Sequence, residues 1–558
     1  MIRIFYTFLI FWCLNCTFVL AQSFRIEDFK KNFSKEEWFK ASGNISVSGS
    51  YYGTNALYNT PPWNYAINGS VNFKLFELIQ IPININLTNS GINYTYPNLP
   101  NRFSIHPSYK CSTLHIGDIS MQYSPYTLAG HQFTGIGIDL TPENWEVSAM
   151  FGRMQRAVEY DSLNTLTSVP AAYKRLGIGA KLKYNHSKFY IGANTFLAKD
   201  DINSLNWKPD SLGITPQQNA AIAIEAGATI IKNLELSINY GLSIFDKDIR
   251  KTDIIPTELY HAIKADISYS FNSHKIGIGY ERIDPNYKTL GAYYFNNDLE
   301  NITLQYASTL WNEKITLSTR LGFERNDLAG TKSDKEMRYV ASCQFDIKPI
   351  ENLQFSVFYS NFQTHQRIKS QFDYINEYNE VENSDTLNFK QISHQATLST
   401  TYRINKKDEF VHIISTNSSF QRNDDDFTTN NDSYNQMINT MLMYQLQIIN
   451  YNISLNTSIN YTNNQTNNNA THYIGPVIGF NISFLKNALR LNTSVSCNQG
   501  FINDSTDMLI GNLRLSLSYT LKEKHCFSLS GNGQLKYNNQ NMTTTYLVNS
   551  SISYSYTF

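Results

Sequence analysis

The sequence lacks long apolar runs, closely spaced cysteines and any excess of one charge. Beyond residue 21, no stretch approaches the ~20 consecutive apolar residues of a transmembrane helix, which excludes a helical membrane protein. Basic and acidic side chains number 46 each among 558 residues, so nucleic acid is not an expected partner. The cysteines beyond residue 21 are too scattered for a metal or redox pair and are expected to be structural residues on strand faces: Cys111, Cys343, Cys497 and Cys526.

Catalytic signatures are missing as well. The chain contains no P-loop, no His-Glu-x-x-His and no Gly-x-Ser-x-Gly motif. His115, His131 and His394 lie on or beside predicted strands, where a serine–histidine pair would support a surface hydrolase. The chain has 11 histidines, so such proximity is expected by chance. We therefore predict no enzymatic activity, no cofactor and no metal site.

Aromatic residues are abundant, with 37 tyrosines and 33 phenylalanines, and they alternate with small polar residues. Every second residue back from the C-terminus is aromatic or aliphatic, apart from Ser550: Phe558, Tyr556, Tyr554, Ile552, Val548 and Tyr546. The same alternation recurs around residues 234–244, 263–271, 315–323 and 513–519. A period of two predicts strands whose two faces meet different environments. A soluble β-sandwich and a membrane barrel both remain possible from this pattern alone.

The connections between these segments favour the barrel. Short turns such as 232–233 and 272–273 alternate with long polar connections such as 246–260, 284–299 and 500–508. An up-and-down transmembrane barrel has such parity, with turns at one rim and loops at the other, whereas a Greek-key sandwich has no reason to keep it. We predict a large single-chain antiparallel barrel of about 26 strands, with 24 allowed because Pro82 and Pro107 weaken two strands.

Aromatic residues also lie near the predicted strand ends, as an interfacial girdle requires. These residues are Tyr51, Tyr123, Trp145, Tyr184, Phe245 and Tyr280. The count treats residues 103–109 as one strand that turns at Lys110. It also leaves the last strand, 546–558, to pair with the first near residues 43–51.

The N-terminus reads as a secretory signal peptide over residues 1–21. Arg3 provides the positive start, residues 4–14 the apolar core, and Val19-Leu20-Ala21 a small-residue cleavage site. Residues 22–40 have a helical period and predict a short periplasmic or lumenal arm, and residues 41–558 form the barrel.

The signal peptide, the tyrosine- and asparagine-rich strands, residues 124–130 followed by Gly135-Ile136-Gly137, and terminal Phe558 resemble outer-membrane β-barrels of the Bacteroidota. The resemblance covers nearly the whole mature chain and implies an outer-membrane location, contact with lipid and lipopolysaccharide, and a closing strand read by the barrel-insertion machinery. Tyr554, Tyr556 and Phe558 are the expected assembly signal. The arm is too short for the plug domain of a TonB-dependent transporter. The resemblance carries no substrate and no functional residue.

The inward face predicts a wet lumen with both signs of charge. This face either filters a polar solute or holds the wall together through ion pairs. The candidate lumen-lining residues are Asp139, Glu146, Lys181, Lys183, Glu225, Glu235, Lys264, Asp266, Glu281, Arg320, Glu324, Arg490 and Arg514. Inward glycines either leave room for an inserted loop or permit curvature: Gly135, Gly137, Gly177, Gly179, Gly277 and Gly279.

Two of the predicted loops are not simply polar. Residues 124–130 are compact and semi-apolar and could form a constriction, and residues 284–295 are aromatic-rich and could bind a sugar or a partner; an ordinary hairpin is favoured for each. The acidic runs 200–201 and 424–426 could hold Ca²⁺, although solvated loop charge is favoured.

The function predicted from these patterns is a passive pore or channel-like protein for polar solutes. The alternative is a structural or assembly component of a surface or secretion complex, bound to other envelope proteins and without an open conduit.

Overall fold

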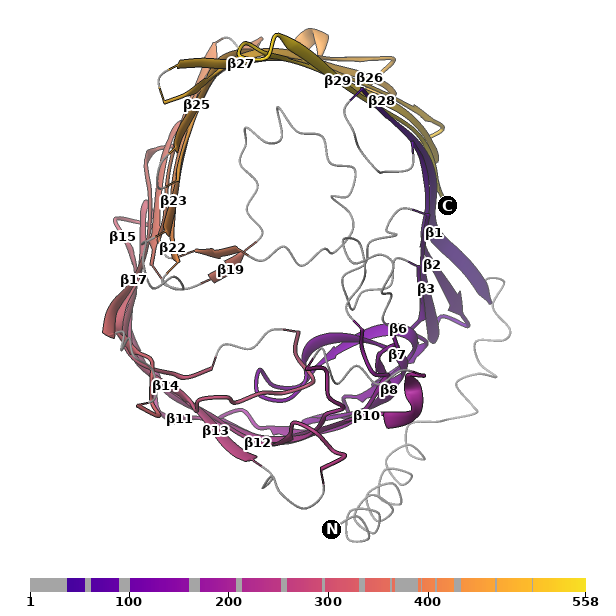
Figure 1. The fold of residues 1–558 in the computed structure, drawn as a ribbon, viewed down its shortest axis with the longest axis vertical. Coiled ribbons are helices and arrows are strands. Elements are labelled where there is room, and N and C mark those ends of the chain that lie inside the picture. Colours follow the sequence, from indigo (N-terminus) through magenta and orange to yellow (C-terminus); the bar gives the residue numbers. More distant parts are fainter. Residues whose placement is uncertain are drawn as a thin grey trace.

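The computed structural model shows a closed antiparallel β-barrel, viewed along its lumen in Figure 1. It describes residues 38–558 except 56–61, 90–100, 160–170, 207–212, 252–257, 294–296, 331–336, 362–363, 367–389, 393, 407–408, 426–432, 467–468 and 504. The predicted signal peptide and nearly all of the predicted arm lie outside the described residues. The first strand begins at Phe39, two residues before the predicted start of the barrel.

The main sheet has 27 strands. Two short strands, β4 and β5, both pair with β3 on one side and β6 on the other, so they share one position and the barrel has 26 positions. The predicted fold class and strand number are therefore confirmed. The break between β4 and β5 falls at His106-Pro107, where proline has no amide hydrogen to donate to the sheet.

The strand bounds follow the chain order. They are β1 (Phe39–Thr54), β2 (Trp63–Leu75), β3 (Ile79–Thr88), β4 (Arg102–Ile105), β5 (Ser108–Tyr109), β6 (Ser112–Gln122), β7 (Ala129–Leu140), β8 (Trp145–Gln155), β9 (Arg175–Asn185), β10 (Phe189–Asp200), β11 (Gln218–Ile231), β12 (Leu234–Asp246), β13 (Glu258–Phe271), β14 (His274–Ile283), β15 (Leu299–Leu310), β16 (Ile315–Arg325), β17 (Met337–Ile350), β18 (Leu353–Ser360), β19 (Thr364–Gln366), β20 (Lys390–Ile392), β21 (His394–Lys406), β22 (Phe410–Asp425), β23 (Ser433–Ile448), β24 (Ile453–Thr466), β25 (Asn469–Phe484), β26 (Leu489–Ile502), β27 (Ser505–Leu521), β28 (His525–Asn538) and β29 (Thr543–Thr557). Strands β19 and β20 form a separate hairpin, and two 3-10 turns, η1 (Ile202–Ser204) and η4 (Ile449–Tyr451), are the described helical segments.

The first and last strands close the barrel. Strand β29 pairs antiparallel with β1 from Asn44 opposite Thr557 to Thr54 opposite Leu547. Phe558 and Gly43 add two backbone hydrogen bonds of 3.0 Å each. The predicted pairing of the last strand with the first is confirmed.

The two rims differ in connection length, as predicted. We call the end with the short turns the turn rim and the opposite end the loop rim. At the turn rim, Asn233, Asn272 and Asn487 adopt positive φ angles of 72°, 48° and 70°, a conformation that asparagine tolerates better than most residues. The alternation of short and long connections fails near the end of the chain, because β26 ends at residue 502 and β27 already begins at residue 505. The predicted long loop at 500–508 is therefore wrong.

The outward face is apolar over the middle of the barrel. Large aliphatic side chains lie exposed there on successive strands, among them Ile136, Ile224, Ile278, Leu304 and Leu513. Tyr51 and Trp145 lie outward near the strand ends, as the girdle prediction requires. Tyr123 and Phe245 do not, because both are buried inside the barrel. No described helix is long and apolar enough to cross a membrane.

Candidate functional site

Two loops from the loop rim fold into the barrel and lie against its wall. They comprise residues 123–130, which follow β6 and include the first two residues of β7, and residues 284–293, between β14 and β15; we call them together the inner layer. Figure 1 shows purple and magenta segments inside the ring near β6 and β12. Leu128 and Tyr287 are completely buried. An ordinary hairpin is the favoured prediction for each loop, with an inward constriction as the alternative for residues 124–130. The inward, packed conformation corrects the favoured prediction and agrees with that alternative for residues 124–130.

The two loops bind each other through backbone and side-chain hydrogen bonds. Leu128 and Gly291 form a parallel bridge, and the Ala129 amide donates to the Gly291 carbonyl at 2.9 Å. The Tyr287 hydroxyl donates to the Tyr126 carbonyl at 2.7 Å. A Cβ atom at Gly291 would lie 2.4 Å from the Thr127 carbonyl oxygen, so only glycine permits this approach.

Small residues of the wall make room for the layer. Gly241 faces the rings of Tyr126 and Tyr287, and the neighbouring Ala223 is fully buried. Gly179 faces Tyr123 at a distance that excludes a side chain. These contacts favour the first of the two predicted roles for inward glycines, space for an inserted loop.

Apolar side chains of the wall pack around the layer in one cluster. Its members are Ile119, Met121, Tyr123, Leu128, Phe133, Met150, Met154, Phe196, Ala198, Phe245 and Leu290. A lumen filled only with water would not favour burial of such side chains on the inward face. The inner layer therefore accounts for their presence in strands whose outward face is also apolar.

Asparagines hold the layer by its backbone. The Asn219 side chain donates to Ser243 Oγ at 2.8 Å and accepts from the Leu290 amide at 3.1 Å. Thr127 donates to Asn194 Oδ1 at 2.5 Å. Unpaired loop backbone inside a protein costs free energy, so these bonds permit the inward fold. Burial raises the pKa of Tyr126 and Tyr287, which keeps both phenols neutral donors.

A buried ion pair lies on the loop-rim side of the inner layer. Arg175 and Asp200 form two bonds, Nε to Oδ1 at 2.7 Å and Nη2 to Oδ2 at 3.0 Å. Asp201 accepts from the Asn203 amide at 3.1 Å. The favoured prediction of solvated loop charge is therefore wrong for Asp200. The other acidic run lies partly outside the described residues, and among those described no group of three or more metal-ligating side chains is placed to hold a metal.

The structure brings several predicted lumen-lining residues into ion pairs. Glu146 contacts Lys181 at 3.2 Å, and Lys183 contacts Glu225 at 3.5 Å. Glu235 contacts Lys275 at 3.0 Å; Lys275 is not among the candidates, although it shares the inward face of Gly277 and Gly279 on β14.

The remaining charged candidates make a single hydrogen bond, lie opposite another charged residue, or lie in a different part of the wall. Glu281 accepts from the Tyr126 hydroxyl at 3.2 Å. Glu324 lies opposite Arg338 in the register of β16 and β17. Arg490 and Arg514 lie on β26 and β27, in a different part of the wall, where Arg490 Nε donates to the Asn487 carbonyl at 3.4 Å.

Asp139 belongs to a chain of polar side chains. Its carboxylate contacts His115 Nε2 at 2.9 Å and also accepts from Ser148. His115 Nδ1 contacts His106 Nδ1 at 2.8 Å, and His106 Nε2 contacts Ser104 Oγ at 2.9 Å. Ser104 is buried, so this arrangement does not present a nucleophile to a substrate.

The two remaining candidate histidines also lack the geometry of a serine–histidine pair. His131 is buried, with Nδ1 2.6 Å from the Gln132 carbonyl and its ring stacked on Tyr293 at 4.1 Å. His394 contacts the Tyr359 hydroxyl at 3.2 Å.

A polar hollow of about 530 Å³ lies on the inner wall below the layer, toward the turn rim. Lys264, Asp266 and Arg320 border it, together with Gln305, whose amide donates to Asp266 Oδ1 at 3.2 Å. Gly279 keeps a neighbouring hollow of about 90 Å³ open, because a Cβ there would lie 2.7 Å from Asp266. The hollow therefore offers a solute hydrogen-bond donors and acceptors, and charged groups of both signs.

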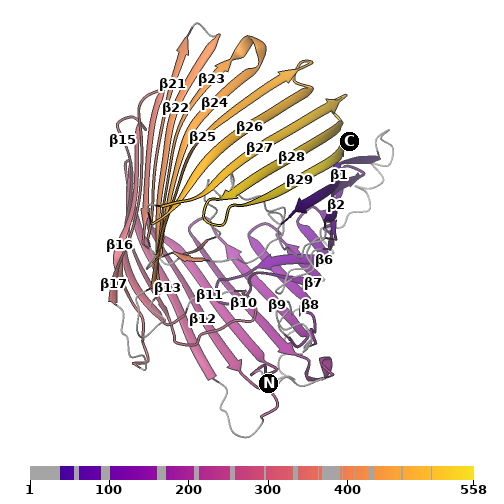
Figure 2. The ribbon, with the colours of Figure 1, turned by 45° about the horizontal axis from the view of Figure 1, so that its top comes forward.

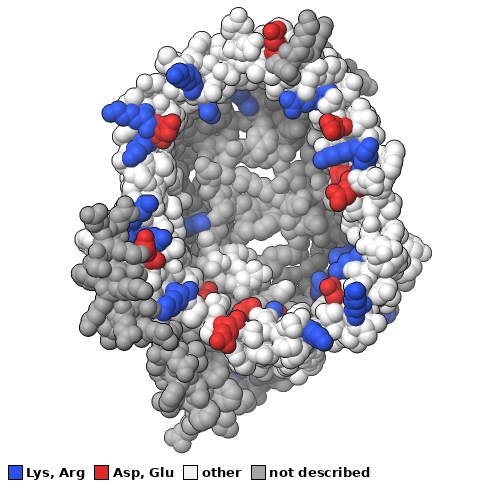
Figure 3. Space-filling view, turned by 180° about the vertical axis from the view of Figure 1, so that it is seen from behind, with Lys and Arg blue, Asp and Glu red and all other residues white. Residues whose placement is uncertain are grey.

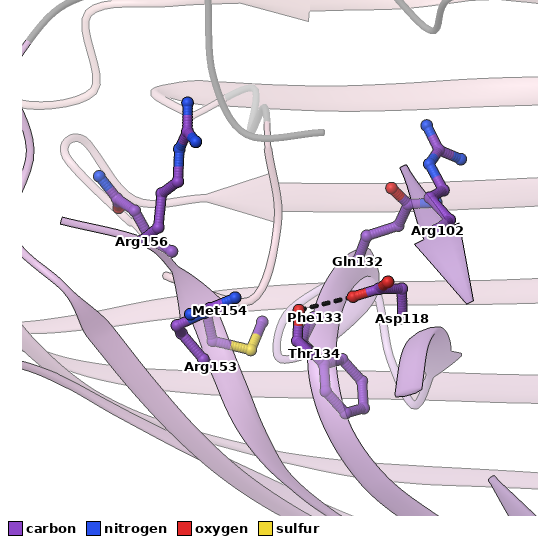
Figure 4. Close-up of a pocket in the computed structure, with 9 residues that line it drawn as sticks. Arg102, Asp118, Gln132, Phe133, Thr134, Arg153, Met154 and Arg156 are labelled. Atoms are coloured by element: carbon purple, nitrogen blue, oxygen red, sulfur yellow. Dashed lines mark hydrogen bonds between the residues drawn. The ribbon is translucent and has the colours of Figure 1, made fainter. Parts of the chain in front are cut away.

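A smaller pocket lies at the loop rim, where β6, β7 and β8 end (Figure 4). Arg102, Arg153 and Arg156 line it, but the figure shows their guanidinium groups apart. Asp118 lies between them and accepts from Thr134 at 2.6 Å. Seen from behind the view of Figure 1, blue and red side chains are distributed around the rim that faces the viewer (Figure 3). We find no single converging anion site in this pocket.

Comparisons with known proteins give fold-level likeness at most. No protein-family model matches the sequence, and a search of curated proteins finds no match. The P pilus usher (PapC) translocation pore aligns with a TM-score of 0.39 and 12% identity over 93% of this chain and 99% of that one. OprD from Pseudomonas aeruginosa gives 0.33 and 10% over 57% and 87%.

A third solved structure, BauA, the ferric preacinetobactin receptor from Acinetobacter baumannii, gives a TM-score of 0.34 and 10% identity. It covers 93% of this chain and 81% of that chain. At such scores the similarities do not bear on function. The barrel fold follows from the closed ladder of this chain itself.

Proposed function

We propose that this protein is an outer-membrane barrel that lets polar solutes pass passively through its lumen. The observation that carries the proposal is the polar hollow of about 530 Å³ on the inner wall of a closed barrel. The apolar outward face supports membrane embedding, since exposed aliphatic side chains on most strands would be unfavourable in water.

Passive passage is favoured over energy-driven uptake. Among the described residues there is no separate plug domain inside the barrel, and the inner layer is built from the loops of the wall itself. A layer of this kind narrows the lumen and leaves it to side chains such as Lys264 and Arg320 to select among solutes.

The location and assembly proposals come from the sequence resemblance. We infer an outer membrane of the Bacteroidota type, with lipopolysaccharide as a neighbour, and insertion by machinery that reads Tyr554, Tyr556 and Phe558. The stacking of Tyr556 on Phe558, with ring centroids 5.5 Å apart, is compatible with an aromatic signal at the closing seam.

A second candidate function is a scaffold that binds envelope partners without an open conduit. The extensive packing of the inner layer favours it, because a layer that never moves would restrict passage permanently. Stoichiometric co-purification of another envelope protein would support this alternative.

Conductance in planar bilayers tests the pore. The full chain should give discrete conductance steps, and liposomes that contain it should swell in uncharged sugars. Protein denatured by heat before reconstitution provides the control. A folded barrel that never conducts, even when the inner layer is displaced by Gly291→Val, would overturn the pore proposal.

A further inference from the structure

Six tyrosine–histidine hydrogen bonds join neighbouring strands of the barrel. Each joins the phenol oxygen to the imidazole Nδ1, and at His274 the Ser308 hydroxyl also contacts Nδ1 at 2.9 Å. The distances are 2.7 Å for Tyr240–His261, 2.9 Å for Tyr306–His274, 3.2 Å for Tyr359–His394, 2.8 Å for Tyr444–His412, 3.1 Å for Tyr461–His472 and 2.8 Å for Tyr554–His525. Six of the chain's 11 histidines are thus engaged in the same way, which is hard to reconcile with chance.

The six pairs repeat one geometry. In five of them the histidine lies opposite a residue two positions from the tyrosine, on the side nearer the rim, as His261 lies opposite Leu242 and His412 opposite Leu446. In the sixth, the register of β18 and β21 ends at Ser360 opposite Gln395, one residue short of His394. The rings are 6.1–6.4 Å apart. Because side chains two positions apart share a face, the tyrosine and histidine always lie on the same side of the sheet.

The pairs are shared equally between the two rims. His274, His412 and His525 begin or nearly begin their strands at the turn rim. The other three lie near the loop rim, within β13, β21 and β25: His261, His394 and His472.

All six pairs face outward, toward the membrane. Their strand neighbours on the same face are exposed aliphatic residues, such as Ile276 beyond His274, Ile414 beyond His412 and Ile474 beyond His472. Tyrosines at the edge of an apolar belt lie at the level of the lipid headgroups. Each imidazole lies one pleat further from the middle of the belt, where headgroup phosphates are found.

The tyrosine determines what the imidazole offers. When the phenol donates to Nδ1, the neutral ring must carry its proton on Nε2, so Nε2–H becomes a donor. If the ring is protonated, Nδ1–H donates to the phenol and Nε2–H is again a donor. In both states the free nitrogen presents a hydrogen to an acceptor beyond the rim. In the third state, the neutral Nδ1–H tautomer, Nε2 only accepts, and a phosphate oxygen beside Nε2 selects against that tautomer.

We propose that the six pairs are binding sites for the phosphate groups of membrane lipids, three in each leaflet. A phosphodiester oxygen accepts from Nε2–H, and the tyrosine holds the ring in the orientation this requires. A hydrogen bond to a charged acceptor is stronger than one to a neutral glycosyl hydroxyl, so the sites prefer phosphate-bearing lipids. The proposal needs only that the barrel is embedded in a bilayer, and it is independent of whether the lumen conducts.

Competition between two lipids tests the proposal. The full-length mature barrel, folded in detergent, is offered equal amounts of phosphatidylglycerol and a galactosyl diacylglycerol with the same acyl chains, and native mass spectrometry counts the lipids retained. We expect a roughly tenfold preference for phosphatidylglycerol. Replacement of His274, His412 and His525 by phenylalanine should remove about half of the retained phosphatidylglycerol molecules, because half of the sites are lost.

Two controls separate this role from that of a general aromatic girdle. His186→Phe alters a turn-rim histidine that stacks on Phe189 without a tyrosine partner, and it should leave the ratio unchanged. Replacement of Tyr306, Tyr444 and Tyr554 by phenylalanine keeps the rings apolar and the imidazoles present, and should weaken the preference. This milder set also serves if the histidine variants fail to fold, as judged by heat-modifiable gel mobility.

The outcomes decide the proposal. Equal retention of the two lipids by the unmodified barrel, or an unchanged ratio in both triple variants, would overturn it. Displacement of phosphatidylglycerol by an equal concentration of inorganic phosphate would assign the sites to a free anion and would overturn the lipid assignment.

Discussion

The wall from β6 to β16 and the wall from β21 to β29 are built differently, although both alternate apolar and polar residues. The first has strands of 10–14 residues, and two of its loops, 123–130 and 284–293, fold inward. The second has strands of 13–17 residues joined at the loop rim by hairpins such as 503–504 and 539–542. Figure 2 shows these longer strands in orange and yellow. We call the two regions the layered wall and the bare wall.

Their inward residues differ accordingly. The layered wall offers glycine, alanine and methionine to the loops that cover it. The bare wall instead carries amides and hydroxyls that bond each other across strands, as Thr462 does to Asn439 at 2.8 Å and Gln534 to Asn512 at 2.9 Å. An inward face can thus be completed either by protein or by polar side chains that remain compatible with water.

Charge follows the same division. Carboxylates occur on nearly every strand of the layered wall, whereas the bare wall has three, all toward the loop rim: Asp424, Asp425 and Asp507. The ion pairs described above all lie between His115 and Arg325. In the described part of the bare wall, hydrogen bonds among amides and hydroxyls, such as those of Thr462 and Gln534, join neighbouring strands on the inward face.

The largest expected effect tests whether the two walls share an outward lipid face. Ile224→Lys in the layered wall and Ile552→Lys in the bare wall place a charge where the side chains are 50% and 66% exposed to lipid. Each should cost about 2–4 kcal/mol near the middle of the bilayer and block assembly. The folded fraction, read from heat-modifiable gel mobility, should fall sharply for both.

Ser553→Lys is the matched control, because its side chain faces the lumen on the same strand as Ile552. Near-normal assembly is expected for this variant. Normal insertion of either isoleucine variant would contradict a lipid-facing surface on that wall.

The second prediction removes the structural difference between the walls by displacing the inner layer. Gly291→Val forces a side chain against the Thr127 carbonyl and should destabilise the inner layer by about 3 kcal/mol. Loops 123–130 and 284–293 should then become accessible to protease from the loop rim, and single-channel conductance should rise. The layered wall would come to resemble the bare one.

Gly511→Val provides the comparison in the bare wall, where a Cβ would meet nothing within 4 Å. Protease resistance and conductance should both match the unmodified protein. Equal behaviour of the two variants would mean that the layer does not depend on the close approach at Gly291.

These walls also show what the sequence could predict. Alternation and connection parity were sufficient for the closed barrel, the strand number and the pairing of β29 with β1, because a period of two and an even strand count follow from local geometry. The inner layer was not predictable in the same way. The loop at 123–130 contacts β10, β12 and β14, which lie far away in sequence. In the sequence only the semi-apolar composition of 124–130 and the aromatic residues of 284–295 set the two loops apart.

The errors have the same origin. Tyr123 and Phe245 were assigned to the girdle because an aromatic residue near a strand end suits both a lipid interface and a buried loop contact. The 500–508 segment was read as a loop because its polar residues resemble those of connections, yet in the bare wall polar residues also extend strands toward water. The role of the charged lumen-lining residues in selecting a solute stays a prediction.

A third prediction compares asparagines in the two walls. Asn219→Ala removes four contacts, to Ser243 Oγ, the Ile244 and Lys288 carbonyls and the Leu290 amide, and should destabilise the inner layer by about 2 kcal/mol. Asn439→Ala in the bare wall loses the bond from Thr462 and should cost about 1 kcal/mol. Protease cleavage at the layer should accelerate only for Asn219→Ala; acceleration by both would show that the walls are mechanically coupled.

The smallest expected effect is a pH dependence confined to the layered wall. Lys288 lies in the inner layer, where burial and then the positive charge of Arg175 lower its pKa below the ordinary 10.5. The Lys288 side chain is exposed in part, so only partial desolvation of its ammonium costs stability below the lowered pKa. As pH rises through that pKa toward 10.5, the folded layer loses its proton first and this small cost disappears. Proteolytic opening of the layer should therefore slow between neutral pH and pH 10.5. Lys288→Met, which keeps the packing on Phe245 without a titrating group, should show the same rate throughout, and a slope that persists in this variant would assign the effect to another group.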